Sequence, residues 1–266
     1  MKKFLLIILF LNSCSSLDID KRFNTIDELN NNEFKEYVFD NKNLKIYSLQ
    51  KVSNNKSLIL YIEGDGLSWI DRFTISSNPT PADPLAFRLA SIDKSENIIY
   101  LARPCQYIWS DSCNQDIWTT SQYSKVILDV YEEILRELAI SYSEIHIVGY
   151  SGGAGIAMYL GSTNNTKIKS IRTVAGNINH NELSKLIKIT PLSKSINFYP
   201  LEEKVSKIPQ IHYYGNKDKV IPNELQKRFY LRNKNPCIKI KQAKATHHKG
   251  WLKFWSNNYN IKLDCS

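Results

Sequence analysis

Short runs of apolar residues recur along the chain from residue 44 onward, and polar or glycine-containing segments separate them. Runs of this length that are rich in Ile, Val and Tyr are typical of strands. Seven strands are predicted, at 44–50, 57–63, 97–102, 144–149, 169–175, 210–215 and 237–242. Between several of them the apolar positions take helical spacing, most clearly in 124–140, and further helices are expected to begin near Gly152, Pro222 and His248. Alternating strands and helices predict an α/β fold, with a mainly parallel central sheet covered by helices on both faces.

The first residues, MKKFLLIILFLNSC, place two lysines before an apolar run that is too short to cross a bilayer. This layout is typical of a secretory signal. Residues 11–14, LNSC, resemble the lipobox of bacterial lipoproteins, in which cleavage precedes the cysteine and a lipid is attached to its sulfur. We therefore predict a signal peptide at 1–13, a lipid on Cys14, a polar tether over 14–43 and one domain over 44–266. An ordinary cleaved signal with an incidental cysteine is the alternative.

The formal net charge is +9, which is suited to anionic lipid headgroups or polysaccharide but which a compositional bias would also produce. The lysines form no long run and show no ordered aromatic interleaving, so no nucleic-acid partner is expected.

Four cysteines follow Cys14, an even number that suits an oxidising compartment. Cys105 and Cys113 are close in sequence and are predicted to form a disulfide, while the pairing of Cys237 with Cys265 is left open. The sequence contains no C-x-x-C pair and no tight histidine cluster with the spacing of metal ligands, so no metal site is predicted.

The segment GYSGGAG, residues 149–155, follows the strand at 144–149 and precedes an apolar stretch compatible with a helix. It matches G-x-S-x-G, in which a strained turn raises a serine above the sheet and small neighbours avoid a clash with the strand and the helix. Ser151 is the predicted nucleophile. A phosphate-binding turn is the alternative, but neither GK[ST] nor G-x-G-x-x-G is present in the sequence.

A serine hydroxyl needs a base to take its proton and an acid to orient that base. Asp218 follows the strand at 210–215, and His247 and His248 follow the last predicted strand. The order Ser, Asp, His is that of α/β-hydrolases. The other histidines are interpreted differently: His146 and His212 lie within predicted strands and should be packed, and His180 is expected on a loop.

The segment EGDG, residues 63–66, follows the strand at 57–63, and its glycines permit close approach of the backbone to a reacting carbonyl. The oxyanion donors are therefore expected to be the amide of Gly152 and an amide near Asp65. Residues 66–96 and 103–123 are predicted to be two long irregular loops, which are commonly functional in a compact domain. The aromatic residues of the second loop are expected to pack beneath it rather than line a pocket.

From about residue 57 to residue 255 the chain resembles the α/β-hydrolase superfamily. It is also similar to a bacterial lipoprotein-like branch in which GDG, RPCQY (here 103–107), GYSGG, TVAGN (here 173–177) and a histidine four residues before tryptophan recur. The last motif favours His247 over His248, because Trp251 follows it at that spacing. Glu63 differs from many members of the wider superfamily, which carry histidine in the oxyanion loop.

The resemblance implies an α/β-hydrolase fold and a serine hydrolase that cleaves a small-molecule or lipid ester, or a thioester, with Ser151, His247 and Asp218. It implies no metal and no organic cofactor. Together with the signal, it implies a lipid-anchored enzyme of the bacterial cell envelope, on the periplasmic or outer-surface side. The alternative is a non-catalytic lipoprotein that uses the same fold to bind envelope components.

Overall fold

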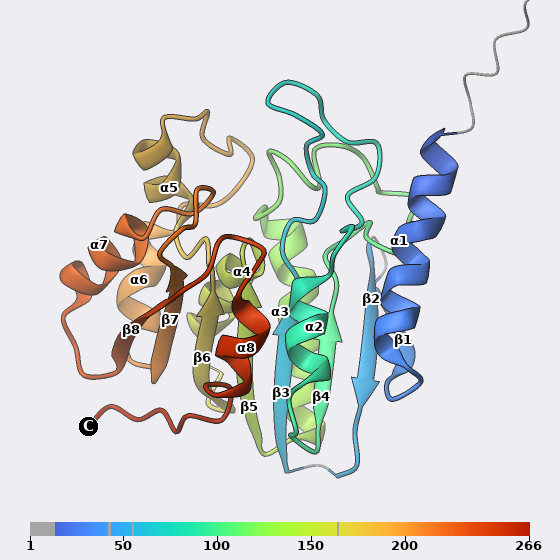
Figure 1. Cartoon of the computed structure of the whole chain (residues 1–266). Helices are drawn as coiled ribbons and strands as arrows, with labels where there is room; N and C mark the ends of the chain where they lie inside the picture. The colour runs from blue at the N-terminus through green and yellow to red at the C-terminus, as the bar shows by residue number, and fades with distance from the viewer. Residues whose placement is uncertain (1–13, 42–43, 55, 164) are drawn as a thin grey trace, which may run out of the picture.

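A single eight-stranded sheet forms the centre of the computed structural model, which describes residues 14–41, 44–54, 56–163 and 165–266 (Figure 1). The predicted signal peptide lies outside the described residues. The strands are β1 (Lys35–Asn41), β2 (Leu44–Lys51), β3 (Ser57–Ile62), β4 (Ile98–Leu101), β5 (Glu144–Tyr150), β6 (Ile168–Val174), β7 (Gln210–Gly215) and β8 (Ile238–Ala243). Their order is β1-β2-β4-β3-β5-β6-β7-β8; β2 is antiparallel to both of its neighbours and every other pair is parallel. The expectation of a mainly parallel sheet is confirmed.

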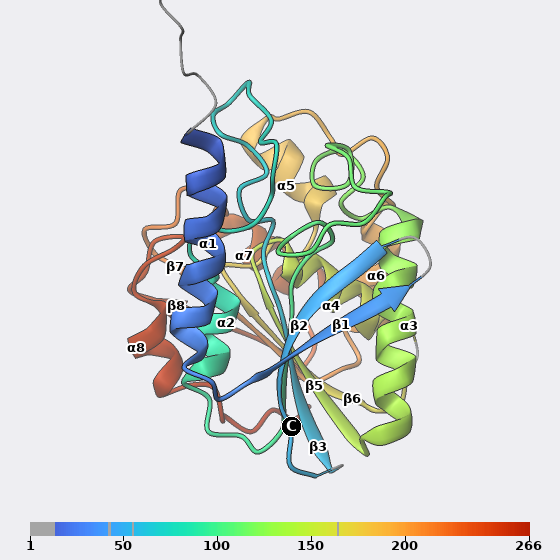
Figure 2. The same cartoon turned by 90° about the vertical axis from the view of Figure 1, so that its right-hand side faces the viewer.

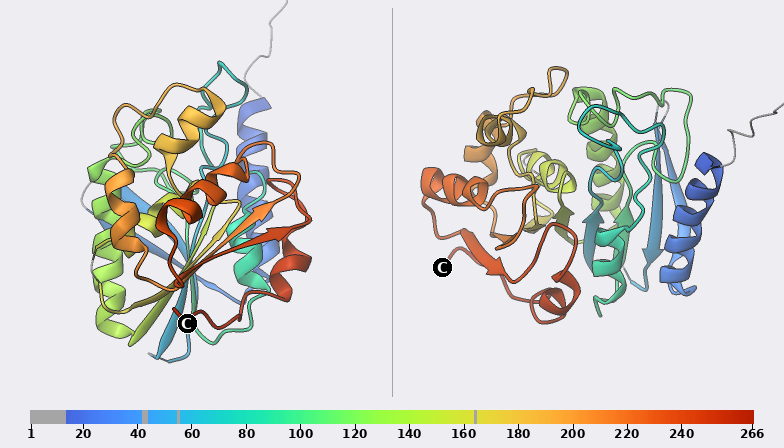
Figure 3. Two further views of the ribbon diagram at one scale, coloured as in Figure 1. Left: turned by 90° about the vertical axis from the view of Figure 1, so that its left-hand side faces the viewer. Right: turned by 45° about the horizontal axis from the view of Figure 1, so that its top comes forward.

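Helices cover both faces of this sheet, as the side views show (Figures 2 and 3). They are α1 (Cys14–Asn30), α2 (Leu85–Ser91), α3 (Lys125–Ser141), α4 (Gly153–Gly161), α5 (His180–Ile187), α6 (Tyr199–Val205), α7 (Glu224–Asn233) and α8 (Trp251–Ser256). In Figure 2, α1, α2 and α8 lie on one face, and α3, α4 and α6 lie on the other. Two buried apolar clusters correspond to these two layers, so each helical layer has its own core against the sheet.

The segment expected to be a tether is folded, and the predicted domain boundary at residue 44 is wrong. Residues 35–41 pair with β2 along their whole length, and α1 packs against the domain through Ile26, which is 1 % exposed. The strand was not recognisable because β1 is an edge strand on which Phe39 is the one buried side chain, so its sequence lacks apolar alternation. Among the described helices, none is long and apolar enough to span a membrane.

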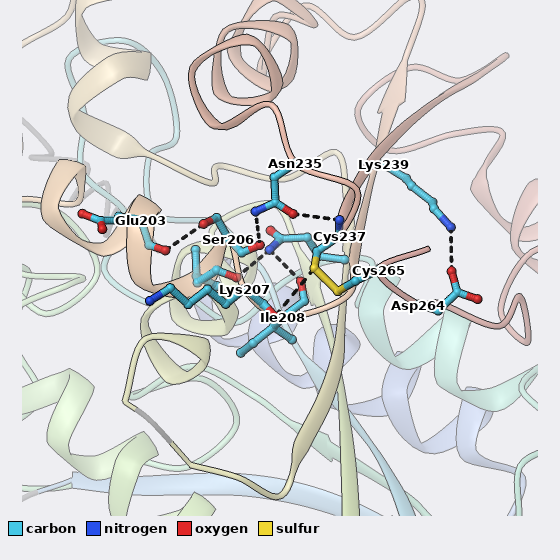
Figure 4. The surroundings of a disulfide bond; sticks show 11 residues. Glu203, Ser206, Lys207, Ile208, Asn235, Cys237, Lys239, Asp264 and Cys265 are labelled. Carbon is cyan, nitrogen blue, oxygen red and sulfur yellow. Dashed lines mark hydrogen bonds and ion pairs between the residues drawn. A yellow bond between two sulfur atoms is a disulfide. The ribbon is translucent and has the colours of Figure 1, made fainter.

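Two disulfides close loops in the structure, Cys105–Cys113 and Cys237–Cys265. The second joins the chain after α8 to the residue that precedes β8 (Figure 4). Asn235 supports this junction: its side chain donates to the carbonyl of Ser206 and accepts from the amide of Cys237, both at 2.8 Å. Lys239 and Asp264 form an ion pair beside it at 3.2 Å. The final described residues are therefore held against the edge strand of the sheet.

Candidate active site

Ser151 lies in the turn between β5 and α4, where its φ of 47° places it in the left-handed region that non-glycine residues rarely adopt. Steric contacts explain the glycines two residues before and two residues after Ser151. A Cβ on Gly149 would lie 2.6 Å from the Cα of Ala154, and a Cβ on Gly153 would lie 2.3 Å from the carbonyl oxygen of Ile62. The turn is thus as tight as the motif predicts, and it lifts Ser151 from the carboxyl end of a central strand.

Backbone bonds from the next strand hold this turn in place. The amide of Ser151 donates to the carbonyl of Val174 at 3.0 Å, and its carbonyl accepts from the amide of Asn177 at 2.8 Å. The hydroxyl of Tyr123 donates to the carbonyl of Gly152 at 3.0 Å. The strained serine is therefore fixed by several bonds from outside its own turn, as a costly backbone conformation requires.

Ser151, His247 and Asp218 form a continuous hydrogen-bonded row. Ser151 Oγ lies 3.0 Å from His247 Nε2, and His247 Nδ1 lies 2.9 Å from Asp218 Oδ2. With its hydrogen on Nδ1, the imidazole donates to the carboxylate and accepts from the serine hydroxyl. The side chains of His247 and Asp218 are 6 % and 1 % exposed. The structure thus brings together three residues from three distant loops at the carboxyl edge of the parallel strands.

Each partner of Ser151 is oriented by further bonds. The other carboxylate oxygen of Asp218 accepts from the backbone amides of Val220 and Ile221 at 2.8 and 2.9 Å, which directs Oδ2 to the histidine. The indole N–H of Trp251 donates to the carbonyl of His247 at 3.1 Å. The spacing of four residues between histidine and tryptophan therefore has a physical basis, because the first turn of α8 holds the loop that carries His247.

None of the four remaining histidines forms a hydrogen bond with Ser151 in the described structure. His248 Nδ1 is 2.9 Å from the hydroxyl of Tyr150, and burial lowers the pKa of His248, as does the neighbouring His247. His212 is fully buried and His146 is part-buried in their strands, so the expectation of packing is confirmed. The loop expectation for His180 is wrong: it begins α5 and is buried with Tyr123, with its ring stacked at 5.2 Å. Asn179 caps this helix, a signal that the sequence analysis missed.

The loop after β3 passes directly over Gly152. A Cβ on residue 152 would lie 1.9 Å from the Oδ1 of Asp65, so a larger residue there would displace the carboxylate that Arg103 binds. Within the described part of the chain, the amides of Asp65 and Gly152 donate to no protein group. The sequence predicted oxyanion donors at Gly152 and near Asp65, and both of these amides are available to a ligand.

Two residues of the RPCQY segment anchor this loop, and their role was not foreseen. Arg103 Nη1 donates to Asp65 Oδ1 at 2.9 Å, and Gln106 Nε2 donates to the carbonyl of Gly64 at 3.1 Å. Burial lowers the pKa of Arg103, but Asp65 and nearby tyrosines raise it above its ordinary value. The segment follows β4, whose carboxyl end neighbours that of β3, and this position is the signal that could have revealed the contact.

Glu63 lies beneath the loop and is 1 % exposed. Its carboxylate accepts from the amides of Gly64 and Ala86 and from the hydroxyl of Tyr100. Burial raises the pKa of Glu63 to about 7, although these hydrogen bonds act to lower it. Where many superfamily members carry histidine, this chain therefore has a titratable carboxyl group.

A cavity of about 530 Å³ opens at Ser151. Its lining includes residues of the loop after β3, residues 81–83, Tyr150, Val220 and both adjacent histidines. The aromatic loop at 103–123 contributes no lining residue; Tyr107, Trp118 and Tyr123 are buried beneath it, as expected, whereas Trp109 is exposed. Among the described residues, no group of three or more His, Cys, Asp and Glu side chains is arranged to hold a metal ion.

The sheet order, the serine turn and the cavity at the carboxyl ends of the strands define the class: the chain has the α/β-hydrolase fold. Solved esterases share it. Est1E from Butyrivibrio proteoclasticus is 13 % identical with a TM-score of 0.59, covering 84 % of this chain and 94 % of its own. The carboxylesterase CesB from Bacillus subtilis is 11 % identical with a TM-score of 0.57, covering 92 % and 96 %. The esterase Pf2001 from Pyrococcus furiosus is 15 % identical with a TM-score of 0.59, covering 85 % and 88 %.

The family follows from the sequence. The model of the FSH1 serine hydrolase family matches residues 90–250, which is more than half of the chain, and the chain belongs to this family. No curated protein matches the sequence.

Proposed function

We propose that this protein is a serine esterase of the bacterial cell envelope, which cleaves an ester or thioester with Ser151 as nucleophile, His247 as base and Asp218 as the orienting acid. The observation that carries the proposal is the hydrogen-bonded row from Ser151 Oγ through His247 to Asp218, with distances of 3.0 and 2.9 Å. These are the distances at which a base can take the proton of a nucleophile.

In the first half of the reaction, Ser151 Oγ attacks the acyl carbon while His247 Nε2 takes the hydroxyl proton. Asp218 stabilises the imidazolium that forms and does not itself become protonated. The tetrahedral intermediate then collapses. Its leaving alcohol or thiol takes the proton from His247, and the acyl group remains on Ser151.

In the second half, water takes the place of the leaving group. His247 removes a proton from the water, the resulting hydroxide attacks the acyl carbon, and the second tetrahedral intermediate expels Ser151 Oγ. The proton on His247 returns to the serine, and a carboxylic acid leaves.

In each intermediate the oxyanion is held by the amides of Gly152 and Asp65. Both are without a protein acceptor in the described structure, and both belong to segments fixed from outside: the serine turn by β6 and the Asp65 loop by Arg103 and Gln106. Donors that are fixed before the charge develops stabilise it without a cost of reorganisation.

The similar solved structures support an ester substrate, since an esterase and a carboxylesterase are among them. The sequence supports an envelope location, since a signal peptide and a lipid on Cys14 fit its first residues. The bound lipid would keep the enzyme at a membrane surface. Its substrate would there be a small-molecule or lipid ester.

A fluorophosphonate probe tests this function, because it reacts preferentially with an activated serine. The purified full chain should be labelled on Ser151, as peptide mass mapping would show, and should hydrolyse one or more members of a series of nitrophenyl esters of graded acyl length. Ser151→Ala should lose both signals. A folded parent that is inert to the probe and to the esters would instead support the non-catalytic binding lipoprotein.

A further inference from the structure

A hairpin beside the cavity, residues 67–76, exposes a group of large apolar side chains. Trp69, Ile70 and Phe73 are 46 %, 63 % and 86 % exposed. Exposed apolar residues are unremarkable when scattered, but three within five residues form a local apolar surface. Packing does not explain them, because none of the three side chains belongs to either buried apolar cluster.

The hairpin is ordered by its own hydrogen bonds. Trp69 pairs with Ile75, and the amide of Ile70 donates to the carbonyl of Thr74 at 2.9 Å. Asp71 closes the tip by accepting from the amides of Phe73 and Thr74 at 2.8 and 2.9 Å. The apolar side chains are therefore presented to solvent by a defined turn, which lowers the entropy cost of binding them to a surface.

This hairpin forms part of the cavity rim. Leu67, Ser68 and Trp69 line the cavity that opens at Ser151. On another part of the rim lies Val220, which is 48 % exposed and follows the exposed Lys219. Arg72 lies within the hairpin, with its guanidinium 5.7 Å from the ring of Phe73. Apolar and aromatic groups beside cations are typical of surfaces that enter the headgroup layer of a bilayer.

The helix that follows the predicted lipid anchor lies at the same end of the molecule. Arg22 of α1 donates to the carbonyls of Thr80 and Asn78, which follow the hairpin. Cys14 precedes Arg22 by eight residues, about 12 Å of helix. In Figures 1 and 2 the first turn of α1 and the loop after β3 both lie at the top. Because residues of that loop line the cavity, Cys14, the first residue of α1, lies on the side of the molecule that carries the hairpin and the cavity.

We propose that the hairpin at 67–76 inserts Ile70 and Phe73 into the interfacial layer of a lipid bilayer and turns the cavity toward that bilayer, so that the substrate is an acyl ester carried by a membrane lipid. The substrate class rests on the proposed esterase function, whereas the membrane contact of the hairpin does not. A bilayer is favoured over a protein partner because the anchor, the apolar tip and two cations of the rim, Arg72 and Lys219, lie at one end. The net charge, about +7 without the two lysines of the predicted signal peptide, also favours anionic headgroups.

The test uses the full chain reconstituted on vesicles of phosphatidylethanolamine and phosphatidylglycerol that contain a brominated phospholipid, which quenches tryptophan emission at short range. Three proteins are compared: the parent, the double variant Ile70→Ser/Phe73→Ser, and Ile140→Ser. Ile140 is a matched control, because it is 88 % exposed near the end of α3. It precedes the amino end of β5, whereas the cavity opens at the carboxyl ends of the strands. Turnover is measured on a long-chain ester within the vesicles and on a soluble short-chain ester.

The parent should be quenched, and Trp69→Phe should remove most of that quenching. The double variant should lose quenching, and its vesicle turnover relative to soluble turnover should fall by roughly tenfold or more, since it lacks two apolar side chains that bury in the interface. Its turnover of the soluble ester should be unchanged, because neither residue lines the cavity. Ile140→Ser should match the parent in every measurement.

Three outcomes would overturn the proposal. The first is quenching and relative turnover in the double variant that equal those of the parent. The second is an equal loss in Ile140→Ser. The third is a parent that is a dimer in solution while the double variant is a monomer, which would assign the hairpin to a protein interface. If the parent hydrolyses neither ester, the esterase proposal fails by itself, and the quenching data still decide whether the hairpin contacts the bilayer.

Discussion

Arg103 donates to Asp65 across 2.9 Å, and this ion pair lies directly beside the amide of Gly152. The contact joins the loop after β4 to the loop after β3. An isolated carboxylate in this place would repel the negative oxygen of a tetrahedral intermediate. The guanidinium neutralises Asp65, so the loop can bring its amide to the reaction centre without adding a net negative charge.

We therefore expect Arg103→Met to lower kcat/KM by about 10- to 100-fold. This is no more than the lower end of the roughly 10²- to 10³-fold loss that follows removal of an oxyanion donor, because the donor is displaced and not removed. It should also lower the free energy of unfolding by about 1–3 kcal/mol, because the carboxylate loses its partner. Arg103→Lys keeps the charge but not the fork of donors and should be intermediate. Ester kinetics and urea unfolding measure both effects.

A double-mutant cycle provides the control for this pair. Asp65→Asn removes the charge that Arg103 neutralises, so Arg103→Met should cost less stability in the Asp65→Asn background than in the parent. Strictly additive losses would mean that the two side chains do not act together.

His247→Ala should lose most turnover, on the order of 10³-fold or more, because Ser151 would have no base. His248→Ala is the matched control one residue away, and its turnover should stay within about tenfold of the parent, since His248 contacts Tyr150 and not the nucleophile. Kinetics on folded, purified variants decide between them. The reverse ranking would move the role of base to His248.

Glu63 should make stability depend on pH. Its pKa is raised to about 7 in the folded chain, above the ordinary value of 4.5, so between these values the folded chain binds more protons than the unfolded chain. The free energy of unfolding should therefore fall as pH rises from 4.5 to 7, by up to about 3 kcal/mol from this residue, and then level off. Glu63→Gln should remove this contribution.

Urea unfolding of the parent and of Glu63→Gln at intervals between pH 4.5 and pH 8 measures this difference. Glu137→Gln, at an exposed position on α3, is the control and should follow the parent. Parallel pH curves for the parent and Glu63→Gln would contradict the assignment of the group.

Cys14→Ser should leave the protein without lipid. We expect acyl mass on the N-terminal peptide of the mature parent and none on the variant, and a shift of the variant out of the membrane fraction. Mass spectrometry and fractionation of bacterial cells measure both. A parent that carries no acyl mass would contradict the anchor and leave the hairpin as the membrane contact to be tested.

The disulfide between Cys237 and Cys265 closes a loop with a sequence separation of 28 residues. Its removal in Cys237→Ala/Cys265→Ala should lower the free energy of unfolding by about 3 kcal/mol, chiefly because the unfolded chain gains freedom. Denaturant unfolding without reductant measures the loss. With added reductant, which also opens Cys105–Cys113, the parent and the variant should become about equally stable. Equal stability of the untreated parent and the untreated variant would mean that the bridge contributes nothing.

The sequence predicted β2 to β8, since each is a short segment with recurring apolar residues, and it placed α3 correctly from its amphipathic spacing. It could not reveal β1, whose side chains mostly face solvent, or α2, which follows a proline-rich loop. It also nominated Ser151, Asp218 and His247 from strand ends and motifs. The contact of Arg103 with Asp65 could not be predicted, because it depends on how two loops of irregular backbone cross, and no periodicity describes that crossing.

The disulfide between Cys237 and Cys265 also determines how a mechanical force on the C-terminal end would pass into the fold. A pull on the chain beyond Cys265 passes through the sulfur bridge to Cys237 and on into the segment before β8. The residues between the two cysteines, which include β8, the loop of His247 and α8, are bypassed by that path. Tension on the end of the molecule would therefore leave His247 unloaded, at its hydrogen-bonding distance from Ser151.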